Sequence, residues 1–181
     1  MVLTGCDHEY MLTKDGIAEL ERLAKTIKYP ETDMHFTTTL LRAQDTFKIL
    51  YPNMEIDDKL YKCREISFGK YDGVSIHTIN HNNLFDEWLT DDHDMGFERF
   101  YKFKNRCVDG LVDIMDECGD RGYNSATLVC HMGTMRAILI HLLRINPHTY
   151  MSLQAKNGSG HILHIKADRQ GYEVLSDEDI Y

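Results

Sequence analysis

The stretch SATLVCHMGTMRAIL, Ser125–Leu139, predicts a buried strand that runs directly into a helix. Ser125–Cys130 is an apolar run of strand length, as expected for a strand that is buried on both faces. The run ends at His131, Gly133 follows, and apolar residues then recur at helical spacing. A strand followed at once by a helix is the repeating unit of α/β proteins. His131 therefore stands at a strand-to-helix junction.

The rest of the chain alternates in the same way. Thr13 is expected to cap the first helix with its side chain. The expected elements are a helix over 13–28, a strand over 33–38, helices over 40–50, 97–118 and 135–142, and two strands around a turn at 168–171. Such alternation predicts a three-layer α/β/α fold with a mainly parallel central sheet.

The length of 181 residues predicts a single domain over 1–181, and 43% apolar residues are enough for a substantial core. Residues 52–96 are polar and rich in Asp and Asn, with glycines at 69 and 73. This segment is predicted to be a loop-rich insert on the substrate side of the domain, since long loops often carry function.

Composition excludes several classes of protein. A net charge of −9 argues against a nucleic-acid binder, which needs a basic face. No apolar stretch has the length of a membrane span, and no signal peptide opens the chain. The five scattered cysteines favour reduced thiols in a cytoplasmic protein. Neither G-x-G-x-x-G nor G-x-x-x-x-G-K-[ST] occurs, and the ten histidines show no convincing metal-ligand spacing.

Two predicted strand-to-helix junctions carry groups that suit an anion. Arg42 lies in the first turn of the helix that follows the strand over 33–38, and His131 precedes the helix at the second junction. In a parallel sheet both junctions lie at the carboxyl ends of strands, where such folds bind ligands. Helix N-termini there favour phosphate, and a guanidinium adds a fork for its oxygens. Arg42 alone is better explained as a surface residue early in a helix, and His131 alone is equally well explained as a strand-end histidine, so the prediction depends on the pair.

Five segments also resemble, in the same order, the motifs of one known family. TTTLLRAQDTFKIL is similar to S-S-x-L-x-R-A-x-x-T-A, CREISFGKYDG to L-x-E-x-x-x-G-x-W-E-G, and LVCHMGTMRAIL to V-x-H-G-G-x-x-R-x-L. LTKDGIAELERLA resembles an L-T-x-x-G-x-x-Q-A helix, and GFERFYKFKNR resembles the stretch before the histidine motif. These are motifs of the histidine phosphatase superfamily, also called phosphoglycerate mutase-like. The main matched positions are Thr37, Thr38, Leu40, Arg42, Ala43, Thr46, Glu65, Gly69, Tyr71, Asp72, Gly73, Val129, His131, Gly133, Arg136 and Leu139.

The resemblance implies a phosphoryl-transfer site that works without a cofactor. In the family a histidine attacks phosphorus and forms a phosphohistidine. By position, Arg42 would hold phosphate oxygens, His131 would stabilise the transferring group, and Met132 would stand beside them where a glycine is usual. Glu65 would protonate the leaving oxygen and then activate water. The implied partner is a small phosphorylated substrate or inorganic phosphate, and self-association stays open.

The family's L-x-R-H-G-x-T signature, which carries the nucleophile on a first, central strand, has no match in this sequence. We align Thr4 and Gly5 with residues that normally follow the signature. A less favoured alignment treats residues 1–3 as a stub of the strand and makes His8 or Cys6 the nearest nucleophile. We therefore expect a first strand that is shortened or missing, which would leave unpaired backbone groups in the core.

Three explanations are consistent with the missing motif. The sequence is a shortened version of a longer chain, the gap is filled by rearrangement or by another subunit's strand, or the protein is a degenerate relative. We favour the first, because Arg42, Glu65 and His131 all remain in register. The leading hypothesis is a phosphomonoesterase that acts on a small phosphorylated metabolite. The alternative is a catalytically inactive module that binds a phosphorylated ligand or a protein.

Overall fold

The computed structural model of the chain describes residues 2–79, 84–92, 94–168 and 171–180. Helix α1 spans Lys14–Thr26, and Thr13 caps it by accepting a hydrogen bond from the Gly16 amide at 3.0 Å, which confirms the predicted cap. Its buried residues are Leu20 and Leu23. The helix ends before the predicted Lys28, because the backbone at Ile27 is already extended.

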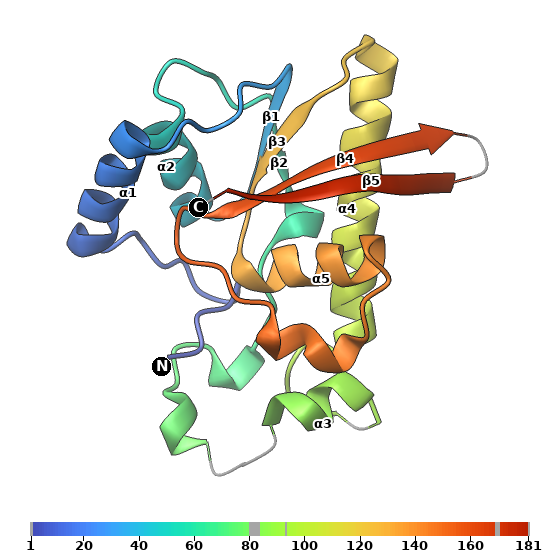
Figure 1. Cartoon of the computed structure of the whole chain (residues 1–181). Helices are drawn as coiled ribbons and strands as arrows, with labels where there is room; N and C mark the ends of the chain where they lie inside the picture. The colour runs from blue at the N-terminus through green and yellow to red at the C-terminus, as the bar shows by residue number, and fades with distance from the viewer. Residues whose placement is uncertain (1, 80–83, 93, 169–170, 181) are drawn as a thin grey trace.

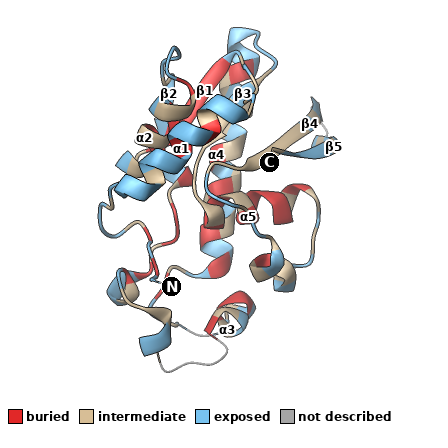
Figure 2. Cartoon of the chain, turned by 60° about the vertical axis from the view of Figure 1, so that its left-hand side comes forward, coloured by how far each residue is buried: buried red, intermediate tan, exposed pale blue. Residues whose placement is uncertain are grey.

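The central sheet has three parallel strands in the order β2-β1-β3. They span Asp58–Leu60 (β2), Met34–Thr38 (β1) and Ala126–Val129 (β3). All five residues of β1 are buried, because this strand lies between the other two (Figure 2). Helices α2 (Leu41–Leu50) and α5 (Met132–Leu142) follow β1 and β3 within a few residues. The predicted α/β fold with a parallel sheet is therefore confirmed.

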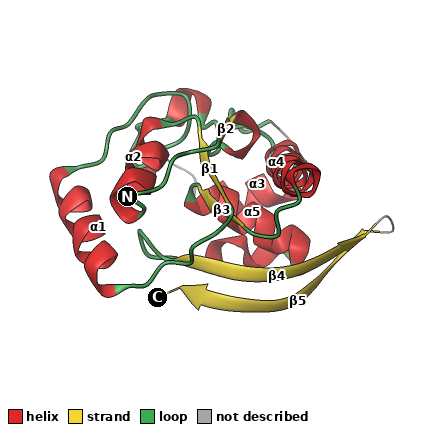
Figure 3. Ribbon diagram, turned by 90° about the horizontal axis from the view of Figure 1, so that it is seen from above, coloured by secondary structure: helices red, strands yellow, loops and turns green. Residues whose placement is uncertain are grey.

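Helices cover both sides of this sheet (Figures 1 and 3). Helices α1 and α2 pack on each other on one side, and α4 (Phe100–Arg121) and α5 pack on each other on the opposite side. The predicted apolar stripe of α4 is buried, but the helix lies three residues later than expected. It ends at Gly122, whose φ of +72° is in the left-handed region that favours glycine. The buried members of the stripe are Phe100, Phe103, Cys107, Ile114 and Cys118.

Strand β3 is less buried than its apolar sequence predicts. Ala126 is exposed, and Thr127, Leu128 and Val129 are only partly buried. The expectation of a strand buried on both faces is therefore wrong for this structure. The reason is topological: β3 pairs with β1 along one edge, and among the described strands none pairs with its other edge. An apolar strand with an open edge is unusual, because its unpaired backbone groups invite a further strand.

The remaining strands form a separate antiparallel pair. Strand β4 spans Gly160–Asp168 and β5 spans Gly171–Ile180, as the predicted turn between them requires. Figure 3 shows this ribbon curving beside the central sheet without joining it. Leu163 and Ile165 of β4 pack at the margin of the larger core cluster.

The segment 52–96 contains more regular structure than its polar sequence suggests. It holds β2, 3-10 turns at Tyr61–Cys63, Gly69–Tyr71 and Ile76–Thr78, and helix α3 at Leu84–Thr90. A further 3-10 segment spans Pro147–Ser152.

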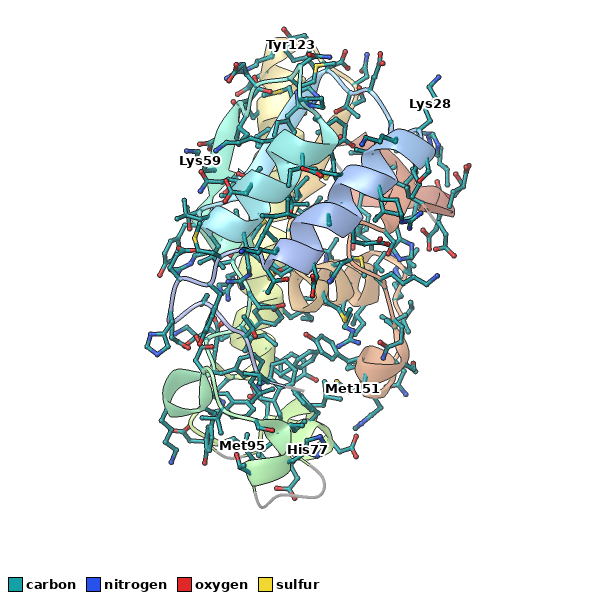
Figure 4. The ribbon with its side chains drawn as sticks, turned by 90° about the vertical axis from the view of Figure 1, so that its left-hand side faces the viewer. Lys28, Lys59, His77, Met95, Tyr123 and Met151 are labelled. Atoms are coloured by element: carbon teal, nitrogen blue, oxygen red, sulfur yellow. The ribbon has the colours of Figure 1, made fainter. Side chains whose placement is uncertain are left out.

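Figure 4 shows His77 and Met95 at the end of the molecule opposite Tyr123, which precedes β3 in the chain. The outer part of the segment therefore lies toward the carboxyl ends of the parallel strands. No helix in the described part of the chain is both long and apolar enough to cross a membrane.

Candidate active site

The carboxyl ends of β1 and β3 bring Thr38 and His131 into contact. Thr38 is the last residue of β1, and His131 stands between β3 and α5. The Thr38 Oγ1 and His131 Nε2 atoms lie 2.8 Å apart, a hydrogen bond in which the tautomer decides the donor. The two junctions that the sequence singled out are thus neighbours at one edge of the sheet. Cys130, beside His131, is held as an uncharged thiol, since burial raises its pKa well above the ordinary value.

His131 is held as a neutral imidazole. Burial lowers the pKa of His131 to about 3, and the positive charge of Arg42 acts in the same direction. A neutral imidazole near pH 7 carries one N–H donor and one acceptor nitrogen. His131 can therefore donate one hydrogen bond to an anion without bringing a full positive charge.

Arg42 lies in the first turn of α2 and reaches the segment that precedes α1. Its Nη2 donates to the carbonyl oxygen of Gly5 at 2.8 Å. Its Nη1 is buried and has no hydrogen-bond partner among the described residues. A buried N–H group without a partner is costly, so this edge of the guanidinium is suited to an acceptor that the protein itself does not supply.

Glu65 is buried between the end of β2 and the start of α5. Its Oε1 accepts from the Ile66 amide at 2.9 Å and its Oε2 accepts from the Gly133 amide at 3.0 Å. Burial raises the pKa of Glu65 despite these two hydrogen bonds and the nearby Arg42 charge. Gly133 is required here, because a Cβ at this position would lie 2.0 Å from Glu65 Oε1. The carboxyl group is thus placed to hold or release a proton inside the site.

The segment before Glu65 is fixed by Arg106 of α4. Arg106 forms a two-pronged ion pair with Glu98, with both N–O distances at 2.7 Å. Its remaining N–H groups donate to three carbonyl oxygens, of Lys62 at 2.8 Å, Arg64 at 2.7 Å and Glu65 at 2.8 Å. Sequence reasoning did not assign Arg106 a role, although it ends the quoted GFERFYKFKNR segment.

The segment around Cys6 and His8 contributes backbone rather than a nucleophile. The amides of Gly5, Asp7 and His8 all donate to the buried Asp72 carboxylate, at 2.9, 2.9 and 3.1 Å. His8 is exposed and lies edge-on to the Tyr10 ring. Burial raises the pKa of the Cys6 thiol, which disfavours the reactive thiolate. Neither residue has the environment of an activated nucleophile.

The N-termini of the two helices already donate to carboxylates of the protein, although the sequence suggested them as donors to a phosphate. The Leu41 amide at the start of α2 donates to Glu9 Oε1 at 2.9 Å, and the Gly133 amide near the start of α5 donates to Glu65. Carboxylates therefore take the positions that favour anions at helix N-termini. Met132 is the first residue of α5 and is partly buried beside this contact.

The described residues contain no cluster of three or more side chains that could hold a metal ion. His161 lies 2.9 Å from Asp177 and 3.2 Å from Asp179 on the β4–β5 ribbon. Two of the ten histidines, His81 and His93, lie outside the described residues. Trp88 is buried and donates to the Glu98 carbonyl at 2.8 Å, so it belongs to the core rather than to a pocket surface.

A comparison with models of known protein families identifies one family. A model described as "Histidine phosphatase superfamily (branch 1)" matches residues 3–178. A curated relative, "Putative phosphoserine phosphatase 2" of Hydrogenobacter thermophilus, is 24% identical over 174 residues, which cover 91% of this chain and 82% of that protein.

Solved structures share the fold at low sequence identity. A mycobacterial glucosyl-3-phosphoglycerate phosphatase superposes with a TM-score of 0.77 at 18% identity, over 98% of this chain and 90% of that one. A mutant phosphoserine phosphatase from Entamoeba histolytica, solved with phosphoserine, gives 0.73 at 20% identity, over 97% and 87%. YhfR of Bacillus stearothermophilus gives 0.74 at 21% identity, over 96% and 86%.

Proposed function

The chain belongs to the histidine phosphatase superfamily, and on that premise we propose that it is a phosphomonoesterase acting on a small phosphorylated metabolite. The observation that carries the proposal is the convergence of His131, Glu65 and the Arg42 fork at the carboxyl ends of the parallel strands. Arg42 is positively charged, His131 is neutral and Glu65 can exchange a proton, and phosphoryl transfer uses all three properties. Electrostatic stabilisation of the transferring group is the main task of such a site.

Arg42 and the neutral His131 bind the phosphoryl oxygens. The buried Nη1 of Arg42 offers a charged donor, and the imidazole offers a neutral one that Thr38 orients. Two donors of different charge hold a dianion without neutralising it completely, so phosphorus stays open to attack. A nucleophilic imidazole forms the new N–P bond while the P–O bond to the ester oxygen breaks.

Glu65 serves as acid and then as base. Burial raises its pKa, which favours the protonated carboxyl group, and in the proposed reaction this proton passes to the leaving ester oxygen as the P–O bond breaks. The carboxylate that remains then takes a proton from water, and this water attacks the phosphohistidine and releases inorganic phosphate. Arg106 keeps the Glu65 backbone in place during both steps through its bond to the Glu65 carbonyl.

The imidazole that attacks phosphorus is not one of the side chains described so far. Among the described residues, no second imidazole is hydrogen-bonded to Arg42, Glu65 or His131. The open edge of β3 supports the proposal that an additional parallel strand pairs there and carries the nucleophile at its carboxyl end. Such a strand would also bury the partly exposed β3 residues and pair its backbone groups.

Related proteins support a small phosphate ester as the substrate. The curated relative and the Entamoeba neighbour carry the name phosphoserine phosphatase, and the mycobacterial neighbour that of a glucosyl-3-phosphoglycerate phosphatase. The second candidate is an inactive module that binds a phosphorylated ligand. It is favoured by the lack of a described nucleophile and by the carbonyl oxygen that already occupies Arg42.

Two measurements test the proposal. The natural chain, with any in-frame codons upstream of Met1 included, is assayed for release of phosphate from an aryl phosphate and from phosphoserine. Hydrolysis that is lost in His131→Ala and in Glu65→Gln, with folding retained, supports the enzyme. If the natural chain binds phosphate but hydrolyses neither ester, the inactive module is the correct reading.

A further inference from the structure

Arg64 places a second guanidinium beside the candidate phosphate site. Its backbone is held firmly, because its carbonyl oxygen accepts from Arg106 Nη1 at 2.7 Å and from Thr134 Oγ1 at 3.3 Å. Its side chain turns toward the segment before α1, where Nη2 donates to the carbonyl oxygen of Cys6. No motif of the sequence drew attention to this arginine.

Arg42 and Arg64 bind the two ends of one short stretch of backbone. Arg42 donates to the Gly5 carbonyl and Arg64 donates to the Cys6 carbonyl, so two adjacent peptide oxygens face two guanidinium groups. Burial lowers the pKa of His131 most, and the positive charges of Arg42, Arg106 and Arg64 act in the same direction. The arrangement resembles the way in which two forks bind neighbouring oxygens of one phosphate.

Both arginines also keep a buried donor without a partner. Arg42 Nη1 and Arg64 Nε are shielded from solvent and have no hydrogen-bond partner among the described residues. A peptide oxygen is neutral and satisfies only one edge of each fork. A phosphate presents several charged oxygens, and a guanidinium can bind two of them at once through parallel N–H···O bonds. Exchange of the backbone for an anion is therefore favourable for these two side chains.

The same stretch of backbone is tied down by groups other than the arginines. Asp72 accepts from the Gly5, Asp7 and His8 amides, and Asp7 accepts from the Gly69 amide at 2.8 Å. These bonds hold the amide side of the segment, whereas the two carbonyl oxygens of Gly5 and Cys6 are held by the arginines. Because each peptide unit is planar, a carbonyl that turns away from its arginine takes the next amide with it. Displacement therefore also breaks the Cys6 amide bond to the Ile66 carbonyl at 3.1 Å and the Asp7 amide bond to Asp72 at 2.9 Å, whereas the Gly5 and His8 amides can keep their bonds to Asp72.

We propose that Arg64 is a second phosphate-binding guanidinium, and that the Gly5 and Cys6 carbonyls hold the place of phosphate oxygens until an anion displaces them. The inference deepens the proposed function, on which it rests for the nature of the ligand. It concerns binding alone and needs no turnover.

The test uses inorganic phosphate as the probe, with isothermal titration of the wild-type chain and of Arg64→Gln. Because a hydrogen bond to a charged group is lost, we expect phosphate affinity to fall about tenfold or more in Arg64→Gln. The matched control is Arg121→Gln, whose exposed side chain pairs with Glu117 at the far end of α4, and it should keep the wild-type affinity. Equal affinity in wild type and Arg64→Gln, or no phosphate binding by the wild type, overturns the assignment.

Hydrogen exchange tests the displacement separately. Phosphate should speed exchange of the amides around Gly5 and Cys6, whereas an anion that merely adds to a fixed pocket would slow it. Slower exchange in that stretch refutes displacement. If the wild-type chain binds phosphate but hydrolyses no ester, the proposed function is refuted and this inference stands, since binding and hydrolysis are measured independently.

Discussion

Replacement of Gly133 by alanine tests the packing that places Glu65. A Cβ at Gly133 would lie 2.0 Å from Glu65 Oε1 and 2.9 Å from both Glu65 Cδ and the Tyr150 hydroxyl. A Cβ atom in a real protein is essentially never this close to a non-bonded atom, so either the Glu65 carboxyl group or the start of α5 must move. Either movement breaks the 3.0 Å bond from the Gly133 amide to Glu65 Oε2.

The expected loss follows from three contributions. Overpacking of a buried position costs about 1–3 kcal/mol, and a lost hydrogen bond to a buried acid costs about 1–3 kcal/mol. Alanine in place of glycine returns up to about 1 kcal/mol of helix propensity. We therefore expect Gly133→Ala to lower the free energy of unfolding by about 1–6 kcal/mol.

Urea unfolding followed through the single, buried Trp88 measures this change. The matched control is Gly119→Ala on α4, where an added Cβ meets no atom within 4 Å. That variant should be as stable as wild type or more stable by up to about 1 kcal/mol. An unfolding free energy of Gly133→Ala within about 0.5 kcal/mol of wild type would contradict the packing argument, since it lies inside the range of ordinary surface substitutions.

Three further predictions concern charge. Since the pKa of His131 is lowered from 6.5 to about 3, its contribution to stability is present above pH 6.5 and is lost as the pH falls toward 3. In urea unfolding, His131→Gln should therefore lose less stability than the wild type over this pH range. His164→Gln, a change at an exposed histidine, should lose as much as the wild type. Since the pKa of Glu65 is raised above 4.5, the stability of the wild type should decline as the pH rises above 4.5. Glu65→Gln should remove this decline. If the thermal midpoint of Glu65→Gln depends on pH as that of the wild type does, the prediction is wrong. Arg106→Lys should cost about 2–4 kcal/mol, because the fork that binds three carbonyls is lost, whereas the exposed Arg121→Lys should cost less than about 0.5 kcal/mol in the same denaturation assay.

Elements with local signals could be predicted closely. The Thr13 cap and the apolar spacing after it depend on neighbours within a few residues, and α1 begins where they indicate. Strand β2 could not be predicted, since Asp58–Leu60 is short and carries two charged side chains. It is a strand because the edge of β1 offers hydrogen bonds, and strand formation depends strongly on such context.

The candidate site divides in the same manner. Arg42, Glu65 and His131 could be proposed as site residues from the sequence because each lies in a stretch with its own motif. Arg106 and Arg64 could not, because their importance lies in carbonyl oxygens from segments distant in sequence. Arg106 reaches back 41 residues to the Glu65 carbonyl, and Arg64 reaches back 58 residues to that of Cys6.

The sequence by itself determined the order of the longer helices and of strands β1, β3, β4 and β5, and the junctions where Arg42 and His131 lie, since periodicity and helix-start signals are local. Only the tertiary structure decided the state of the site. Among the described strands it left one edge of β3 unpaired, and it placed carboxylates at both helix N-termini and a backbone carbonyl against one edge of the Arg42 guanidinium. The physical reason is that every buried donor needs an acceptor, and which acceptor is nearest depends on packing between distant segments.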